Sequence, residues 1–359
     1  MGKKPKVSII MSVYNEEEFL CECIDGINAQ TYPDYEVIVI DDGSTDKTSD
    51  ILYSWSTEND RVRIITRKNE GLTSALNLAI SLARGEYLAR HDADDISAPN
   101  RLEEQVEFLD RHSDVVLVGS HVVEFEKKQS LITLYMPPDS HEFIVNTLHK
   151  GENPLVHGSI MLRKSAFKKL SEGYRFRYSQ DYDLYLRMLH LGDLRIIPEV
   201  LYALRSHSSR IGVKARVFRR PIRKLIMQMN GLIPWDPKSE SIIANYKGDK
   251  PLWQVLEERL TQTLSIPSKK KMYAQHFMTM IGDNLEKDRR INALTSALNA
   301  IKNCPVWPKS WLSLPYALIG ILLPRSIIAQ WRSRSTLGKY RTPCQVNSLE
   351  EVFNKSENS

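Results

Sequence analysis

Residues Glu86–Asp95, EYLARHDADD, give the clearest indication of the fold of this chain. The first half is a short apolar run typical of a buried strand, and three carboxylates follow within four residues. Like charges gathered at a strand end are costly unless a positive group lies beside them. Hard oxygen donors at this spacing suit Mg²⁺ or Mn²⁺, which take one or two carboxylates and the phosphate oxygens of a bound molecule. A solvated acidic turn is the alternative interpretation of this stretch alone.

Composition and charge place the chain among ordinary globular proteins. It has 359 residues, of which 42% are hydrophobic and 26% are charged, enough for one large domain or two moderate ones. The net charge of +5 is too mild to indicate nucleic acid binding. Cys21, Cys23, Cys304 and Cys344 form no CxxC pair and no metal-finger spacing, so we expect reduced thiols.

The N-terminus imitates a secretion signal, because three lysines precede the apolar run Val7–Val13. The run is short and meets Asn15 and three glutamates without a small-residue cleavage site, so we expect a first strand instead. No apolar run reaches the roughly 18 to 20 residues of a membrane-spanning helix. We therefore expect the protein to remain in the cytoplasm.

Strand and helix patterns alternate through the first hundred residues. Buried strands are expected at Val7–Val13, Glu36–Ile40 and Glu86–His91, and a further strand at Arg61–Thr66, with helices between them. Asn15 and Glu18 have the spacing of a capping box for the first helix. The alternation predicts an α/β fold whose mostly parallel, doubly wound sheet is sandwiched by helices.

Polar clusters follow three of these strands, at Tyr14–Glu16, Asp41–Ser44 and His91–Asp95. Ligands of parallel sheets bind at the carboxyl ends of the strands, so the clusters are expected at one edge. Neither GxGxxG nor GxxxxGK[ST] occurs in the chain. We therefore expect a metal ion to neutralise the phosphates of whatever binds there.

The pattern after Pro99 continues with further helices and strands. Asp181 lies near the start of a helix around residues 178–187, where a carboxylate is often only a helix cap. His207 follows in a polar loop, where an ordinary surface histidine is the alternative to a ligand. The remaining elements expected up to residue 205 are helices at 101–112 and 143–148 and strands at 115–125, 156–162, 195–197 and 200–205.

Six motifs in register resemble the family 2 glycosyltransferases of the GT-A fold, over roughly residues 5 to 210. The bacterial members that build exopolysaccharide, capsule or lipopolysaccharide are the most similar. The motifs are Val13–Glu16, Asp41–Ser44, Asn69–Gly71 with Asn77, Asp92–Asp95 with Pro99, Arg101 and Leu102, Gln180–Leu184, and Arg205 with His207.

The resemblance implies a nucleotide-sugar site. Tyr14 would stack on the uracil of a UDP-sugar, and Asp42 would accept a hydrogen bond from its imide. Asp92 would contact ribose or metal, Asp94 would bind the Mn²⁺ or Mg²⁺ that bridges the diphosphate, and His207 would reach that metal or the diphosphate. Such an ion offsets the charge on the departing UDP. The other residues of the implied nucleotide-sugar site are Ser12, Val13, Glu16 and Ala93.

Asp181 matches the family's catalytic base, which would take the proton of the acceptor hydroxyl in one in-line displacement and so invert the anomeric configuration. The family's usual Glu-Asp pair is Gln180-Asp181 here, and the QxxRW motif of processive synthases is absent. The missing motif favours transfer of one sugar per encounter.

The C-terminal third is expected to be helical and basic. The block 210–224 carries seven basic residues and no acid, and residues 302–349 repeat this pattern around a tryptophan-bordered apolar segment at 305–332. Such a segment favours peripheral contact with anionic membrane at the inner face of the cytoplasmic membrane, where a lipid-linked acceptor would be met. A helical cap packed on the catalytic domain is the alternative.

The sequence thus predicts a GT-A catalytic domain over 1–210, a helical region over 211–348 and a disordered tail over 349–359. Its expected partners are a nucleotide-sugar donor and a glycan or lipid-linked acceptor, and not nucleic acid. Two rival functions are a non-catalytic nucleotide-sugar-binding scaffold and a sugar nucleotidyltransferase. The second rival should carry a glycine- and lysine-rich loop near the start, where the chain has Tyr14–Glu18.

Overall fold

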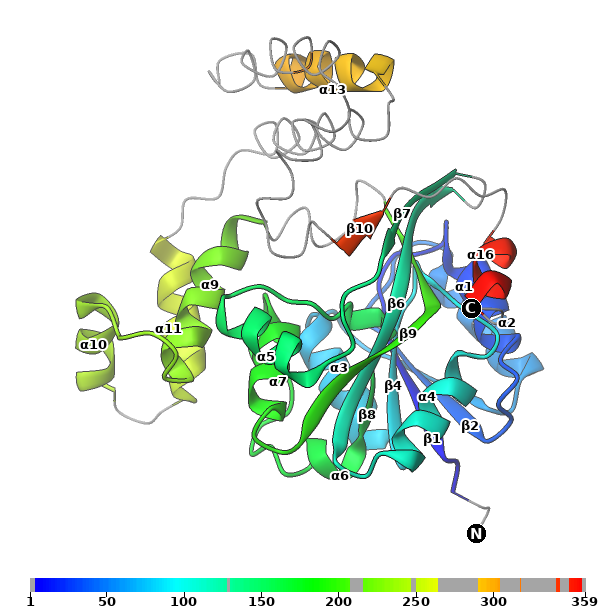
Figure 1. Cartoon of the computed structure of the whole chain (residues 1–359), viewed down its shortest axis with the longest axis horizontal. Coiled ribbons are helices and arrows are strands. Elements are labelled where there is room, and N and C mark those ends of the chain that lie inside the picture. The colour runs from blue at the N-terminus through cyan, green and yellow to red at the C-terminus, as the bar shows by residue number, and fades with distance from the viewer. Residues whose placement is uncertain are drawn as a thin grey trace.

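The structure is a computed structural model of the chain, and it describes residues 4–127, 130–206, 216–246, 250–263, 290–303, 317, 340–342 and 349–356. A twisted sheet runs through the molecule with helices packed on both of its faces (Figure 1). The strands are β1 (Val7–Val13), β2 (Tyr35–Asp41), β3 (Val62–Thr66), β4 (Tyr87–Asp92), β5 (Ile96–Ser97), β6 (Val115–Lys127), β7 (Ser130–Tyr135), β8 (Met161–Arg163), β9 (Asp193–Arg205) and β10 (Arg341–Thr342).

Helices connect and cover these strands. Those of the first 190 residues are α1 (Leu20–Asn28), α2 (Thr48–Glu58), α3 (Leu72–Leu82), α4 (Arg101–Arg111), α5 (His141–His149), the 3₁₀ turn η1 (His157–Ser159), α6 (Lys164–Phe167) and α7 (Gln180–Met188). Those that follow β9 are α9 (Arg216–Met229), α10 (Pro237–Ala244), α11 (Leu252–Thr263), α13 (Arg290–Asn303) and α16 (Leu349–Ser356).

The sheet has a parallel half and a mixed half. Its order is β10-β7-β6-β8-β4-β1-β2-β3, and β9 pairs with both β5 and β6. The pairs β4–β1, β1–β2 and β2–β3 are parallel, as the alternation of strand and helix predicted. β8 is antiparallel to both β4 and β6, so the sheet beyond β4 is not doubly wound.

Neighbouring residues of β1 point into two separate cores, which explains its continuous apolar sequence. Ile9 and Met11 pack with α1, α2 and α4 on one face, while Ile10 packs with α3 and α7 on the other. A strand covered on both faces has no need of polar alternation. The inference that β1 and β2 are buried is therefore confirmed, and β4 is buried up to His91 as well, whereas β3 at the sheet edge buries only Val62.

Local expectations failed where side chains found other partners. Asn15 does not cap α1: it adopts a positive φ of 54°, its side chain accepts the Thr45 N–H at 2.8 Å, and α1 begins only at Leu20. The strand expected at 156–162 is the 3₁₀ turn η1 followed by the short strand β8. The two segments expected at 195–197 and 200–205 form the single strand β9.

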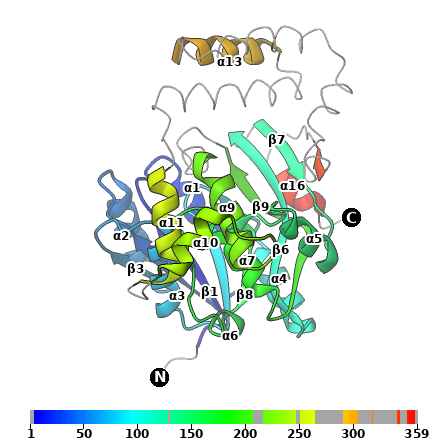
Figure 2. The same ribbon diagram turned by 90° about the vertical axis from the view of Figure 1, so that its left-hand side faces the viewer.

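Helices α9 and α11 pack on the same side of the sheet as α5 and α7 (Figures 1 and 2). The apolar side chains Phe218, Ile222 and Ile226 of α9 are buried in the core on this face, while Arg219 and Lys224 are exposed. The apolar side of α9 is thus covered by protein, not available for a membrane. Among the described residues, no helix combines the length and apolar character needed to cross a bilayer.

The tail after Ser348 was expected to be disordered, but the structure contains helix α16 there. Helix α16 packs beside β9 (Figure 1). Its side chains Leu349, Val352 and Phe353 are buried in the core that also contains residues of α1 and α4. Apolar residues three or four apart give this short helix one face to bury, a pattern that the acidic and polar composition of residues 349–359 obscured.

Replacing Phe353 by alanine should therefore destabilise the whole fold. Phe353 is 8% exposed, and truncation of a buried phenylalanine costs about 3–5 kcal/mol of the free energy of unfolding. Urea denaturation followed by circular dichroism measures this change. Tyr53→Ala is the matched control, since Tyr53 is 71% exposed on α2 and its loss should change the free energy by at most about 0.5 kcal/mol. Equal stability of the two variants would contradict docking of α16.

Candidate active site

Three loops meet at the carboxyl ends of β1, β2 and β4. Ser12 lies opposite Asp92 in the pairing of β1 with β4, and Val13 lies opposite Asp41 in the pairing of β1 with β2. Tyr14 follows directly and is 47% exposed. The register therefore brings the polar clusters expected after these strands to one edge of the sheet.

The acidic loop after β4 gathers three carboxylates. Single oxygen atoms of Asp92, Asp94 and Asp95 lie within 4.8 Å of one another, close enough to share one metal ion. Asp95 is fully buried, and the Tyr202 hydroxyl and the Arg205 N–H donate to its two oxygens at 3.0 and 2.7 Å. The carboxylate of Asp95 thus fastens this loop to β9, and Asp92 and Asp94 remain the better candidates for ligands.

Two buried arginines offset part of this negative charge. Arg90 is 2% exposed and forms an ion pair with Asp92. Burial opposes the charge of Arg90, but Asp92 raises the pKa of its guanidinium above the ordinary value. Arg101 is 1% exposed, and burial lowers its pKa to about 10, which still keeps it charged at neutral pH. The sequence argument assigned this compensation to a metal ion, named Arg101 only as part of a family motif, and did not predict this role for either arginine.

His91 lies beneath the acidic loop and is uncharged at neutral pH. Its ring nitrogens lie 2.7 Å from the Asp92 carbonyl oxygen and 2.9 Å from the Ser97 hydroxyl. Burial, with Arg101 nearby, lowers the pKa of His91 to about 3. This histidine therefore adds no positive charge to the loop, and its hydrogen bonds hold the backbone at Asp92 in place.

Asp42 holds a neighbouring turn together. Its buried carboxylate accepts the Arg67 Nε–H at 2.8 Å and the N–H groups of Glu70 and Gly71 at 3.1 and 2.7 Å. The turn at 69–71 that appeared as a motif in the sequence is thus tied to the end of β2. Arg67 is the residue that sequence reasoning missed here.

The remaining predicted nucleotide-site residues line the same edge. Glu16 donates its N–H to the Thr48 hydroxyl at 2.8 Å, which joins the loop after β1 to α2. Ala93 is 5% exposed between the acids. His207, the second predicted metal ligand, lies outside the described residues.

Asp181 lies in the first turn of α7, and the Asn153 amide donates to its carboxylate at 2.8 Å. Asp181 and Asp92 both act electrostatically on the same three side chains, which are His157, Tyr174 and Tyr185. Burial, with Arg90, lowers the pKa of His157 to about 4 despite these two acids. The acidic loop and the start of α7 therefore face one common group of residues.

Comparison with known proteins identifies the family of this chain. The family model described as glycosyl transferase family 2 matches residues 8–171. The chain is 38% identical over 234 residues to the putative glycosyltransferase EpsE of Bacillus subtilis, which covers 63% of this chain and 82% of that protein. The chain belongs to glycosyltransferase family 2.

Further relatives of this glycosyltransferase include one with a named pathway. The amylovoran biosynthesis glycosyltransferase AmsE of Erwinia amylovora is 30% identical over 211 residues, covering 57% of this chain and 77% of that protein. The solved structure of S. aureus TarS 1-349 in complex with UDP-GlcNAc superposes with a TM-score of 0.51 at 13% identity, over 91% of this chain and 92% of that chain. The predicted fold class is confirmed.

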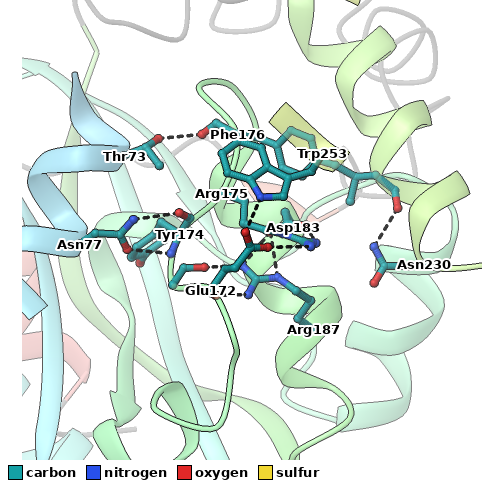
Figure 3. A network of polar contacts seen from close by, with 12 residues as sticks. Thr73, Asn77, Glu172, Tyr174, Arg175, Phe176, Asp183, Arg187, Asn230 and Trp253 are labelled. Carbon is teal, nitrogen blue, oxygen red and sulfur yellow. Dashed lines mark hydrogen bonds and ion pairs between the residues drawn. The ribbon is translucent and has the colours of Figure 1, made fainter. Parts of the chain in front are cut away.

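The loop at 172–178 fixes the start of α7 in this glycosyltransferase (Figure 3). The Asn77 side chain of α3 bonds both the N–H and the carbonyl of Tyr174, at 2.8 and 2.9 Å. The Thr73 hydroxyl donates to the Phe176 carbonyl at 2.7 Å, and Trp253 of α11 donates to Glu172 at 2.8 Å. Contacts from both the sheet domain and the following helices thus hold the loop that precedes Asp181.

Asp183 is the central acid of this network. It is fully buried, and the guanidinium groups of Arg175 and Arg187 both donate to it, with Arg187 also bonding the Glu172 and Gly173 carbonyls. Figure 3 shows the two arginines converging on this one carboxylate. The sequence motif Gln180–Leu184 therefore contains a second acid besides Asp181. This acid, Asp183, holds the loop at 172–178 in place.

Asp183→Ala should be strongly destabilising, because it leaves two partly buried guanidinium groups without their shared carboxylate. Removing one partner of a buried ion pair costs about 3–5 kcal/mol of the free energy of unfolding, measurable by urea denaturation. Asp139→Ala is the control, since Asp139 pairs with Arg195 at the surface and should lose at most about 1 kcal/mol. A cost for Asp183→Ala no greater than that of the control would remove the structural role argued for this acid.

Proposed function

We propose that this glycosyltransferase transfers one sugar, with inversion, from a nucleotide-diphospho-sugar to a hydroxyl group of a glycan or lipid-linked acceptor in surface polysaccharide biosynthesis. The donor is a UDP-sugar. One observation carries the proposal. Asp92 at the end of β4 and Asp181 in α7 are far apart in the sequence, yet both interact electrostatically with the same buried residues, which are His157, Tyr174 and Tyr185. The name of AmsE, which refers to amylovoran biosynthesis, supports the polysaccharide pathway.

The donor set of the acidic loop fits Mn²⁺ or Mg²⁺. Its closely spaced carboxylate oxygens are hard ligands, and the two donors from β9 leave Asp95 engaged, so Asp92 and Asp94 would hold the ion. Such an ion supplies charge neutralisation for a diphosphate leaving group. Arg90 forms an ion pair with Asp92, and the β9 contacts hold the loop backbone in position.

The base of the reaction is Asp181, whose position at the start of α7 is fixed by the loop network. Its carboxylate would accept the proton of the acceptor hydroxyl as that oxygen attacks the anomeric carbon. Asn153 holds the carboxylate in one orientation. Gln180 takes the place of the second acid usual in the family and adds no charge beside the base.

The nucleotide binds across the ends of β1 and β2 in this proposal. The exposed ring of Tyr14 offers a stacking face for uracil, and Ser12, Val13 and Glu16 lie along the same edge. The Asp42 carboxylate, which also forms an ion pair with Arg67, would bind the uracil of the nucleotide. Arg67 would hold that carboxylate in a fixed orientation, as an acceptor for the uracil imide requires.

The test combines nucleotide binding with donor turnover. Asp94→Ala should abolish the Mn²⁺-dependent thermal shift with UDP, because a ligand stabilises only the state that binds it. Asp181→Asn should keep that shift and lose about 10²–10⁴-fold in transfer rate, the usual contribution of a general base. Release of UDP from UDP-sugars measures the rate. Asp50→Asn, which removes an exposed carboxylate on α2, is the control and should match the wild type. Undiminished turnover by Asp181→Asn would remove the base assignment.

We also propose that the basic segment 305–332 binds anionic membrane. This segment lies outside the described residues except for Ala317, so the proposal is based on its sequence alone. Binding to vesicles containing phosphatidylserine should exceed binding to phosphatidylcholine vesicles and fall as salt rises from low to physiological concentration. Flotation with vesicles measures this, and equal binding to both kinds of vesicle would contradict the proposal.

A pair of variants locates the contact. Replacing Arg325, Arg332 and Arg334 by alanine should reduce binding to the anionic vesicles, since each basic group near the surface contributes about 1 kcal/mol. Replacing Arg219 and Arg220, exposed on α9, is the control and should change binding less. The reverse result would place the membrane contact on α9.

A further inference from the structure

The described part of the chain contains buried side-chain nitrogen and oxygen atoms that lack a hydrogen-bond partner. Folded proteins satisfy nearly all buried polar groups, so each exception requires an explanation. The residues that carry these side-chain atoms are Arg90, Glu152, Ser179, Tyr185 and Arg223.

Most of these residues are linked to Asp181. Tyr185 follows it by four residues on α7, so the two side chains share one face of the helix. Ser179 precedes it by two residues, and Glu152 precedes Asn153, whose amide donates to the Asp181 carboxylate. Arg223 of α9 interacts with it electrostatically. Four of the five residues are therefore linked to the proposed base by sequence, through Asn153 or by charge.

Tyr185 is the most informative of these residues. It is fully buried, yet its hydroxyl makes no hydrogen bond within the described part of the chain. Arg90, 2% exposed, also has an unpartnered Nε, and it lies within electrostatic reach of Tyr185. Leaving such groups unpaired costs about 1–3 kcal/mol each, a cost that a bound molecule would remove.

Two further polar side chains belong with these residues, and they are His157 and Tyr174. The His157 Nε2 and the Tyr174 hydroxyl lie 2.8 Å apart, with their rings edge to face at 5.4 Å. Asp92 and Asp181 act on both of them. Asp92 thus interacts with Arg90, His157, Tyr174 and Tyr185, and Asp181 interacts with the last three, so these side chains link the proposed metal ligands to the proposed base.

We propose that the Tyr185 hydroxyl and the Arg90 guanidinium bind hydroxyl groups of the transferred sugar and help to select the donor. This inference rests on the proposed function. A tyrosine hydroxyl both donates and accepts and an arginine only donates, so together they match the hydroxyl groups of a neutral sugar ring. A site that bonds a substrate hydroxyl discriminates strongly against donors that present it differently, because its own buried groups are then unpaired.

Tyr185→Phe tests this directly, since it removes one oxygen and keeps the ring. Removing a buried hydroxyl that has no partner removes an unfavourable contribution to folding, so the melting temperature should be at least that of the wild type. With Mn²⁺, release of nucleoside diphosphate from UDP-glucose, UDP-galactose, UDP-N-acetylglucosamine and GDP-mannose identifies the preferred donor. For that donor kcat/KM should fall about tenfold or more, while the calorimetric Kd for UDP or GDP stays within about twofold.

Tyr182→Phe is the matched control on the same helix. The Tyr182 hydroxyl is paired, donating to the Leu148 carbonyl at 2.6 Å, and Tyr182 is equally buried. Its removal leaves that carbonyl without this donor and should cost about 1 kcal/mol of stability, with kcat/KM of the folded enzyme unchanged. The two variants should therefore show opposite effects on stability and on activity.

Three results would count against these statements, and they are distinguishable. A wild-type enzyme that binds and turns over none of the four donors overturns the proposed function and the sugar site with it. A wild-type enzyme that turns over a donor, with Tyr185→Phe equally active, overturns only the sugar site. Weaker binding of UDP or GDP by Tyr185→Phe, in proportion to its lost activity, assigns Tyr185 to the nucleotide and also overturns the sugar site.

Discussion

The bond between Asp95 and β9 is the interaction on which the candidate site depends. Asp95 ends the acidic loop, and both of its oxygens accept hydrogen bonds from residues of β9, the Tyr202 hydroxyl and the Arg205 N–H. β9 also pairs with β5 and β6 and so belongs to the mixed half of the sheet. One carboxylate therefore joins two parts of the sheet. The parallel half carries the proposed nucleotide site, and β9 follows α7, the helix of the proposed base, in the chain.

The sequence predicted the parallel half of the fold well and the mixed half poorly. Continuous apolar strands such as β1 are determined by burial on both faces, which composition records directly. β8 and β9 are set by pairing across the sheet, and Gly158 shows the limit of local signals. A side chain at Gly158 would overlap the Tyr202 hydroxyl, a contact between residues 44 positions apart. The helix α16 was missed for the same reason, since its apolar residues gain significance only from the core they meet.

At the site, sequence reasoning found the acids and missed the arginines that form ion pairs with them. Asp42 and Asp92 stand out because they follow buried apolar runs, and Asp181 stands out because it lies in a family motif. Arg67 and Arg90 lie in view of the same motifs, but arginine in a sequence is far more often a surface residue, and only coordinates reveal the ion pairs with Asp42 and Asp92. The claim that a metal alone compensates these acids is thus replaced by one in which fixed arginines share that role.

The path of the chain between α11 and β10 has a consequence for how the C-terminal region is attached. Two residues anchor α11 to the catalytic domain: Trp253 donates to Glu172, and Leu256 is buried in the core. Farther along the chain, β10 pairs with β7, and α16 follows it. The chain is therefore attached to the catalytic domain both before and after residues 264–339. A single proteolytic cut between these two attachments would leave the C-terminal fragment held to the catalytic domain by the non-covalent contacts of β10 and α16.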